Sequence, residues 1–186
     1  MRGMATNVPS DFELVNSASE SLDWIGILFD RHAPAVHRYL SRRVGRSSAD
    51  DLLGDVFLVA IDARTRVRPH STGSALPWLY GVAKNVVRAH LRRRSPLNVT
   101  DVSTTVDWDA IDERLDATAW SDRLHTVLNA LSDDDSELLM LIAWERLTPT
   151  EAAEALGLTP VAARSRIHRA RQRAQATLDD LERIQA

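Results

Sequence analysis

The sequence predicts an all-α protein made of two small helical domains that are joined by a flexible linker. Three observations favour this fold class: apolar residues recur at helical spacing, strand-like alternation is absent, and a stretch rich in Ser, Thr and Asp divides the chain. The 186 residues are enough for two small domains. A hydrophobic fraction of 44% and a charged fraction of 26% are ordinary for a soluble globular protein.

The composition along the chain places the domain boundaries. We expect a flexible N-terminal extension over residues 1–21 and a first helical domain over residues 22–94. Residues 95–119 have weak periodicity and many Thr, Ser and Asp residues, which indicates an acidic linker. The second domain then covers residues 120–186.

The first domain contains three helical patterns. Apolar spacing predicts a helix over residues 28–44, with a kink or a restart at Pro34. The Ser-Ser pair that follows can cap the next helix, which runs through LLGDVFLVAIDAR. The Pro, Gly and Ser content of RVRPHSTGSALP indicates a loop. Pro77 then begins the helix WLYGVAKNVVRAHLRRR, one face of which is a polar stripe of Lys84, Asn85, Arg88 and Arg92.

The second domain carries a sequence of cap and turn signals. Ser132 can cap the helix DDDSELLMLIAWERL, and Thr148 or Thr150 can cap the short helix PTEAAEAL. Gly157 ends that short helix at a place where a positive φ is often required. Thr159 and the proline after it open another helix, since Pro is permitted at the first position. A short helix, a Gly-containing turn and a second helix form a helix-turn-helix pattern.

The last helix has one small apolar face and one basic face. Its inward positions are Ala163, Ile167, Ala170, Ala174 and Leu178, whereas Arg164, Ser165, His168 and Arg171 lie outward. Such a narrow helix presents arginines to a groove lined with phosphates. Its first turns can reach base edges, and its later arginines can hold the DNA backbone.

The distribution of charge supports contact with a polyanion at two places. Residues 31–94 contain 13 basic and 4 acidic residues, and residues 156–186 contain 6 and 3, although the whole chain has a net charge of -3. Between these two basic blocks, residues 95–155 contain 3 basic and 14 acidic residues. The two blocks therefore indicate two separate contacts with a polyanion, and the acidic middle must avoid it or contact something basic.

The composition also bears on other classes of protein. The sequence has no cysteine, no apolar run long enough to span a bilayer, and no apolar core of a secretory signal near its start, so we expect a cytoplasmic protein. The histidines are scattered, and we expect no metal site and no cofactor. A metal-dependent enzyme is a further interpretation, because DDLLGD is loosely similar to the aspartate motifs of prenyl synthases. It is disfavoured because no second aspartate-rich motif occurs in a comparable helical context.

Both helical parts resemble one known family. The segment AWERLTPTEAAEALGLTPVAARSRIHRARQRA is similar to the DNA-binding region four of extracytoplasmic-function sigma factors, the smallest type in the sigma-70 family. The segments LFDRHAPAVHRYLSRRVG, ADDLLGDVFLVA and ALPWLYGVAKNVVRAHLRRR resemble region two in the right order. The resemblance covers about residues 22–94 and 120–178.

The resemblance implies a transcription initiation factor that is not an enzyme. Its partners would be core RNA polymerase, through the clamp of the largest subunit and the flap of the second-largest, and promoter DNA. Region two would melt the minus-10 element and region four would bind the duplex at minus 35, while the acidic linker would lie on basic surfaces of the polymerase. Family members are commonly held inactive by an anti-sigma factor, although nothing in this sequence identifies one.

The resemblance also assigns site residues. The helix DDLLGDVF matches the core-binding helix of the family, which gives as polymerase contacts Asp51, Leu52, Asp55, Val56 and Phe57. Contacts to the minus-10 element would come from Arg68, His70, Ser71, Trp78, Lys84, Asn85, Arg88 and Arg92. Trp78 could stack on DNA or anchor the core. Contacts to the minus-35 element would come from Thr159, Val161, Ala162, Arg164, Ser165, Arg166, His168, Arg169 and Arg171.

The chain departs from the family pattern at two places. LSDDDSELL occurs where members usually have a proline and a basic residue before the acidic ones, and Ala162 and Ala163 replace a Thr and a larger aliphatic residue. Two rival functions stay open at this point. A stand-alone helix-turn-helix regulator would leave the LLGDVF helix unexplained, and a helical scaffold would leave the helix-turn-helix unexplained.

Overall fold

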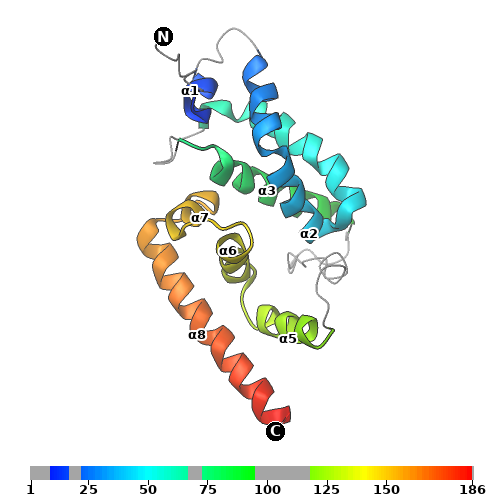
Figure 1. Cartoon of the computed structure of the whole chain (residues 1–186), viewed down its shortest axis with the longest axis vertical. Helices are drawn as coiled ribbons and strands as arrows, with labels where there is room; N and C mark the ends of the chain where they lie inside the picture. Colours follow the sequence, from blue (N-terminus) through cyan, green and yellow to red (C-terminus); the bar gives the residue numbers. More distant parts are fainter. Residues whose placement is uncertain (1–8, 17–21, 67–72, 95–117, 186) are drawn as a thin grey trace, which may run out of the picture.

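The computed structural model describes residues 9–16, 22–66, 73–94 and 118–185, and every regular element in these ranges is a helix. The first domain contains α1 (Asp11–Asn16), α2 (Asp23–Asp62), a short 3-10 turn η1 (Arg64–Arg66) and α3 (Leu76–Arg94). The second domain contains α5 (Thr118–Asn129), α6 (Asp133–Ala143), α7 (Pro149–Ala155) and α8 (Pro160–Gln185). In Figure 1, α3 lies between α2 on one side and α6 and α7 on the other.

The long α2 consists of two helical arms that meet at Gly45. The backbone there has φ 74° and ψ 162°, a conformation that glycine adopts without a steric penalty. Pro34 lies inside the first arm, so the restart that the sequence predicted at this proline is found at Gly45 instead. Each arm turns an apolar face inward, and the buried residues include Leu28, Val36 and Val56.

The short helix α1 is fastened to the first domain by one buried carboxylate. The Asp11 side chain lies 2.7 Å from Arg31 Nη1 and 2.6 Å from His32 Nε2, and it accepts a hydrogen bond of 2.8 Å from the backbone N–H of Ala75. Leu14 adds a buried apolar contact. The N-terminal extension, expected to be flexible, therefore includes a packed helix at residues 11–16.

Local cap signals shape the second domain as the sequence predicted. The Ser132 side chain accepts a hydrogen bond from the backbone N–H of Asp135 at the start of α6. Thr148, not Thr150, caps α7, and Glu151 completes a reciprocal capping box there. These bonds satisfy backbone donors that a helix start leaves open. They fix where α6 and α7 begin, and so they fix the course of the chain into α8.

One hydrophobic core extends through both domains. Leu79 and Val87 of α3 belong to the same buried cluster as Leu138 and Leu141 of α6. Ala155 of α7 also joins it, whereas a smaller cluster lies between α5, α6 and α8. The two domains, which the sequence predicts as separate units on a flexible linker, therefore pack directly against each other.

Candidate nucleic-acid and partner interfaces

Helices α7 and α8 form a helix-turn-helix whose turn depends on two residues. Gly157 has φ 66°, which allows the chain to reverse between the helices. Thr159 then caps α8, because its Oγ1 accepts a hydrogen bond of 3.2 Å from the backbone N–H of Ala162. The expected turn and the expected Thr-Pro start are both present.

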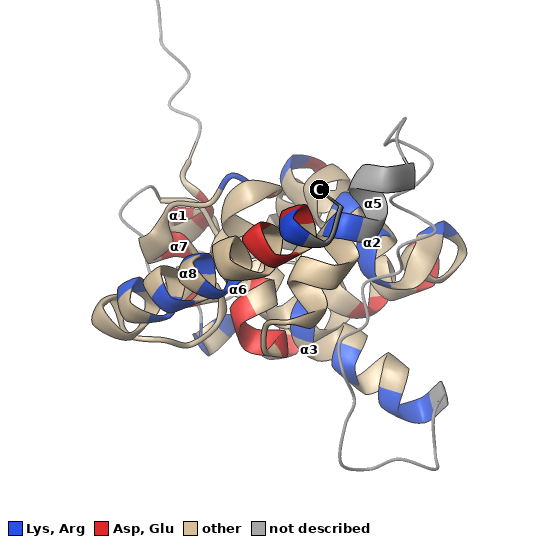
Figure 2. Ribbon diagram, turned by 90° about the horizontal axis from the view of Figure 1, so that it is seen from below, with Lys and Arg blue, Asp and Glu red and all other residues tan. Residues whose placement is uncertain are grey.

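The predicted faces of α8 are reproduced in the first three turns. Ala163, Ile167 and Ala170 are buried, and they allow α8 to pack closely on the rest of the second domain. Most of the predicted minus-35 residues are exposed on the other faces: Thr159, Val161, Arg164, Ser165, His168, Arg169 and Arg171. Ala162 and Arg166 are half-buried. Figure 2 shows basic residues along α8 and acidic residues on α6 near it.

The polar stripe on α3 contains two exposed residues and two residues that are paired with the second domain. Asn85 and Arg92 are exposed. Lys84 is buried, and its Nζ lies 2.9 Å from Asp134 Oδ1, which also accepts a hydrogen bond of 3.0 Å from Arg88 Nη2. Two cations that the resemblance assigns to DNA are thus paired with an acidic residue of the second domain.

The structure describes Trp78 but does not describe the predicted base-capturing residues of the segment before α3. Trp78 is half-buried and packs against the core, beside the buried Pro77. This position favours the interpretation of Trp78 as a core anchor. Arg68, His70 and Ser71, the predicted base-capturing residues, lie outside the described residues.

The second arm of α2 separates the five predicted polymerase contacts into two groups. Asp51 and Asp55 are exposed on one face. Leu52, Val56 and Phe57 are buried, so their side chains belong to the core and are not available as a contact surface. The reason is helical periodicity, since residues 52 and 56 lie four apart on the inward face.

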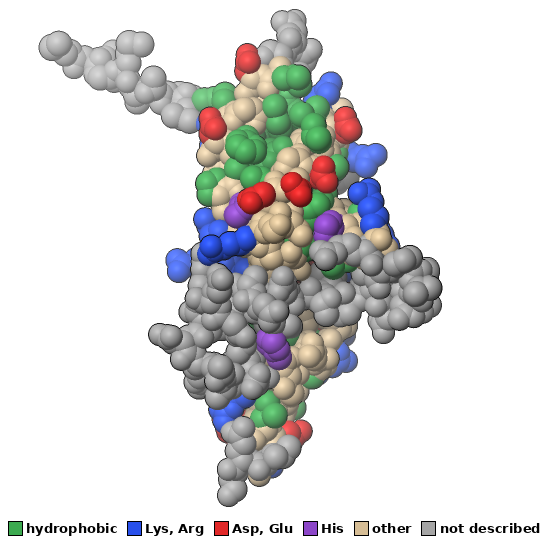
Figure 3. Space-filling view, turned by 90° about the vertical axis from the view of Figure 1, so that its right-hand side faces the viewer, with side chains coloured by type: hydrophobic (Ala, Val, Ile, Leu, Met, Phe, Trp, Pro, Cys, Tyr) green, Lys and Arg blue, Asp and Glu red, His purple; other side chains and the backbone are tan. Residues whose placement is uncertain are grey.

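An exposed apolar surface on α2 was not identified from the sequence. Five large apolar residues in α2 or directly before it are exposed, and we call them the α2 apolar surface: Leu22, Ile27, Phe29, Leu58 and Val59. Leu58 is 63% exposed, more than any other large apolar residue of the second arm. Figure 3 shows hydrophobic side chains gathered on this end of the molecule, with acidic side chains beside them. Leu58 and Val59 stand at helical positions outside the inward stripe, which is the signal that could have revealed them.

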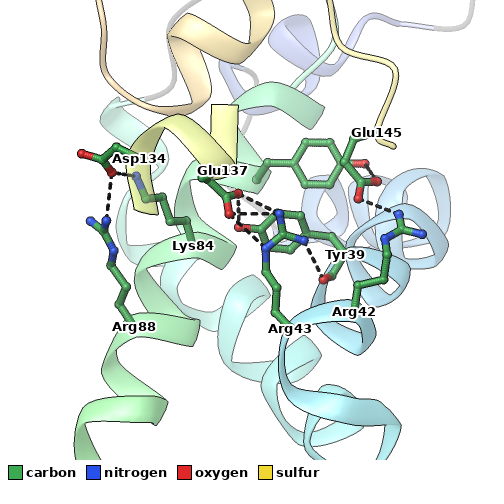
Figure 4. A network of polar contacts seen from close by, with 9 residues as sticks. Tyr39, Arg42, Arg43, Lys84, Arg88, Asp134, Glu137 and Glu145 are labelled. Atoms are coloured by element: carbon green, nitrogen blue, oxygen red, sulfur yellow. Dashed lines mark hydrogen bonds and ion pairs between the residues drawn. The ribbon is translucent and has the colours of Figure 1, made fainter. Parts of the chain in front are cut away.

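A buried ion pair joins the two domains. Arg43 of α2 is 1% exposed and Glu137 of α6 is 2% exposed. Arg43 donates to Glu137 from Nε at 3.1 Å and from Nη2 at 2.9 and 3.0 Å, and the hydroxyl of Tyr39 donates to the same carboxylate at 2.8 Å. Figure 4 shows how these groups converge. No local pattern indicates this pair, because its members are 94 positions apart in the chain.

A second bridge lies beside the first. Arg42 Nη2 donates to Glu145 Oε1 at 2.6 Å, and the hydroxyl of Tyr80 donates to Glu145 Oε2 at 3.1 Å. The guanidinium of Arg42 also lies 5.8 Å from the centre of the Trp144 ring, within the range of a cation–π contact. Helices α2 and α3 of the first domain are thus both tied to the segment that ends α6.

The pKa values of these groups follow their partners. A hydrogen bond from Lys84 is the main cause that lowers the pKa of Asp134, and Arg88 lowers it further. Burial, together with the hydrogen bond to Glu145, raises the pKa of Tyr80 well above its usual range. Burial disfavours the charged form of Asp11, yet hydrogen bonds from His32, Ala75 and Arg31 outweigh it and lower the Asp11 pKa. Asp134 and Asp11 are therefore ionised, and Tyr80 is neutral, at pH 7.

The described part of the chain was also compared with the requirements of a metal site and of a membrane span. In residues 9–16, 22–66, 73–94 and 118–185, no three His, Cys, Asp or Glu side chains gather so that they could hold a metal ion. Across the same ranges, none of the helices is both long enough and apolar enough to cross a membrane.

Comparison with known proteins identifies the family that has this arrangement of helices. The family model of sigma-70 region 2 matches residues 28–96, and that of sigma-70 region 4 matches residues 121–173. The chain is 32% identical over 160 residues to the RNA polymerase sigma factor CarQ of Myxococcus xanthus, covering 83% of this chain and 89% of CarQ. It is 34% identical over 151 residues to the ECF RNA polymerase sigma factor SigC of Mycobacterium tuberculosis, covering 78% of this chain and 80% of SigC.

A solved structure shares the same arrangement of helices. The structure of CnrH in complex with the cytosolic domain of CnrY superposes with a TM-score of 0.59 at 26% identity, covering 91% of this chain and 97% of CnrH. A helical domain with a helix-turn-helix domain after it, in this order, defines a promoter-recognition factor of bacterial RNA polymerase. The chain belongs to the sigma-70 family, as an extracytoplasmic-function sigma factor, and directs RNA polymerase to promoters. Proteins of this family are not enzymes.

Proposed function

We propose that this sigma factor binds the minus-10 element with α3 and the minus-35 element with α8, and binds core polymerase with the second arm of α2. The observation that carries the proposal is the separation of surfaces. Basic residues are exposed on α8 and at Arg92 of α3, whereas α2 presents Asp51 and Asp55 beside the α2 apolar surface. Basic faces suit DNA, and a mixed acidic and apolar face suits a protein.

The α8 surface can read a duplex at its first turns. Arg164 and Ser165 are exposed close to the helix start, where side chains of a recognition helix reach base edges. Arg169 and Arg171 lie further along and can hold phosphates on either side. Because Ala162 and Ala163 offer no polar group, base reading by this helix rests on few side chains.

The α3 surface can hold a single strand. Asn85 and Arg92 are exposed, and Lys84 and Arg88 become available once Asp134 moves away. Arg68, His70 and Ser71 would capture an unstacked base at the loop that precedes α3, as base-flipping sites do. The core position of Trp78 gives it a supporting role for α3 instead of a stacking role.

The α2 surface can bind the polymerase clamp. Asp51 and Asp55 lie four apart on one helix face and can pair with arginines of a partner. Leu58 and Val59 supply apolar area next to them. We propose these four residues as the contact set, with Leu52, Val56 and Phe57 supporting the helix from within.

The proposal also covers the further binding partners of the protein and its location in the cell. The second domain would also touch the polymerase flap, and the acidic residues 95–119 would lie along basic surfaces of the polymerase. The CnrH structure contains the cytosolic domain of a second protein, and this supports binding of an anti-sigma factor by the present chain. We place the protein in the cytoplasm, as a binding factor without catalytic activity of its own.

Gel filtration with core RNA polymerase tests the proposal. The wild-type chain should co-elute with core polymerase, and an Asp51→Arg/Asp55→Arg variant should not, because both charges then repel the partner's arginines. An Asp179→Arg/Glu182→Arg variant on α8 makes the same change of charge away from α2 and should co-elute. Failure of the wild type to co-elute, or co-elution of both variants, would contradict the proposed contact.

A further inference from the structure

The short helix α1 contacts the chain at the place where it enters α3. Residues 11–16 precede the segment that the family model of region 2 matches, which begins at residue 28. We propose that Asp11 of α1 is a positioning residue, which fixes the start of α3 for promoter opening without contacting DNA itself. The inference rests on the proposed function, since it takes α3 as the helix that holds the minus-10 strand.

The carboxylate of Asp11 joins three segments of the first domain. One oxygen lies 2.6 Å from His32 Nε2 and accepts the backbone N–H of Ala75 at 2.8 Å. The other oxygen accepts a hydrogen bond of 2.7 Å from Arg31 Nη1. The Asp11 side chain is 5% exposed, and Ala75 is buried as well. These charge-assisted bonds hold the backbone of Ala75 at a fixed place relative to α2.

A second contact brings the start of α1 against the residue two positions before Ala75. Gly73 has φ 70°, and a Cβ added there would lie 3.3 Å from the Cβ of Ser10. Ser10 is itself held, because its backbone N–H and its hydroxyl donate to Glu13 at 2.7 and 2.8 Å. The start of α1 therefore contacts the chain on its way into α3 at two places, Gly73 and Ala75.

Ala75 sets the position of the proposed minus-10 surface because α3 begins from it. The carbonyl oxygen of Ala75 accepts the backbone N–H of Leu79 at 2.9 Å, which closes the first turn of the helix. Asn85 and Arg92, the exposed residues proposed to hold the single strand, lie on the same helix. The residues proposed to capture an unstacked base precede Gly73 by a few positions. A shift at Ala75 therefore displaces both sets of contacts, because supporting residues fix the geometry of a site.

Promoter opening is the step most sensitive to this position. A base leaves the stack only if the contacts that receive it offset the free energy of unstacking. Binding of core polymerase by α2 and of duplex DNA by α8 does not use the start of α3. Loss of the Asp11 contacts should therefore impair opening and leave assembly of the holoenzyme intact.

Reactivity of unpaired thymines toward permanganate measures promoter opening by the holoenzyme. The DNA is a promoter fragment mapped by run-off transcription with the wild-type chain and core polymerase. Asp11→Asn should slow opening of this duplex about tenfold or more, since small displacements of positioned contacts have effects of this size. On a heteroduplex whose minus-10 element is already mismatched, run-off transcription at saturating holoenzyme should stay close to the wild-type level, because the strands are separated in advance.

Two variants separate positioning from stability. Glu13→Gln changes an exposed carboxylate of the same helix, whose hydrogen bonds are to Ser10, and should open the duplex as the wild type does. Val36→Ala removes apolar contacts from the buried face of α2 and should lower the midpoint of urea unfolding while opening stays normal. If Asp11→Asn is not recovered folded, Arg31→Met takes its place and should slow opening less, since Asp11 then keeps its bond to Ala75.

The outcomes distinguish the positioning role from the proposed function. Normal opening by Asp11→Asn, equal losses on the duplex and the heteroduplex, or equally slow opening by Val36→Ala would overturn the positioning role. Failure of the function proposed for α3 has a different signature, because an Asn85→Ala/Arg92→Ala chain would then open the duplex normally. Co-elution with core polymerase shows that each variant has assembled before its opening rate is compared.

Discussion

At the scale of single residues, three buried or half-buried carboxylates join segments that are far apart in the sequence. Asp11 connects α1 to α2 and to the start of α3, Glu137 connects α6 to α2, and Asp134 connects α6 to α3 and α8. Each accepts hydrogen bonds from several donors, and these donors lower the pKa values of Asp11 and Asp134. Read locally, all three are acidic residues near helix starts, and their partners are visible only in the folded chain.

The environment of Asp11 predicts a specific loss of stability in acid. Its pKa is lower in the folded chain than in the unfolded chain, so its contribution is complete at neutral pH and is lost as the pH falls below about 4. Asp11→Asn should lower the free energy of unfolding by about 2 kcal/mol at pH 7, the scale of hydrogen bonds to a charged group. Urea unfolding at pH 7 and near pH 3 should show the variant and the wild type converging in acid.

A neighbouring carboxylate provides the control for Asp11. Glu13 lies on the same helix, is exposed, and has a pKa that is lowered by hydrogen bonds from the Ser10 backbone and side chain. Glu13→Gln should therefore change stability less than Asp11→Asn at neutral pH. If Asp11→Asn keeps the full acid sensitivity of the wild type, the assigned role of Asp11 is wrong.

At the scale of elements, the sequence was most informative where structure depends on neighbours along the chain. The sequence predicts the cap at Ser132, a cap at Thr148 or Thr150, the helix start at Thr159 and the turn at Gly157, because these features involve residues only a few positions apart. Which side chains of a helix point into the core was predicted less well. Leu52, Val56 and Phe57 belong to the core because α3 covers that side of α2, and this depends on packing between distant segments.

The turn of the helix-turn-helix predicts a local cost of substitution. Gly157 has a positive φ, which costs a residue with a Cβ about 1–2 kcal/mol. Gly157→Ala should therefore lower the free energy of unfolding by about 1 kcal/mol, as measured by urea denaturation. Gly26→Ala, at a helical glycine with open space around it, should be neutral or stabilising by up to about 1 kcal/mol. Equal effects of the two substitutions would contradict this account of the turn.

The position of α8 predicts which arginines matter for promoter use. Arg164→Ala should weaken run-off transcription from minus-35-dependent promoters by the equivalent of about 1–3 kcal/mol, since the residue is exposed at the end of the helix that we propose reads the bases. Arg183→Ala, near the other end of α8, should leave transcription close to the wild-type level. Core polymerase should bind both variants. Similar losses in both variants would show that α8 acts by overall charge and not by position.

At the scale of the whole molecule, the distribution of charge suggests two separate units, whereas the hydrophobic core is shared between them. The basic residues are concentrated in two blocks with an acidic block between them, which suggests two independent DNA-binding units. The hydrophobic core nevertheless extends from α2 and α3 into α6 and α7. The acidic block explains both facts, because its α6 residues neutralise cations of the two basic blocks and bring the units together.

This arrangement predicts a large change of shape on transcription initiation. With fluorescent labels on Thr65→Cys and Gln172→Cys, the two cysteines of an otherwise cysteine-free chain, the free chain should show one population of high energy transfer, and addition of core polymerase with a promoter fragment should convert it to a population of much lower transfer. The physical reason is that α3 and α8, which we propose to bind separate promoter elements, cannot move apart while Asp134 bridges them. Labels at residue 30 in α2 and residue 65 in η1 lie in the same domain, so the energy transfer between them should not change. If the 65–172 transfer stays the same in an active promoter complex, the closed contacts persist during initiation, and α3 and α8 cannot both be the promoter-binding helices.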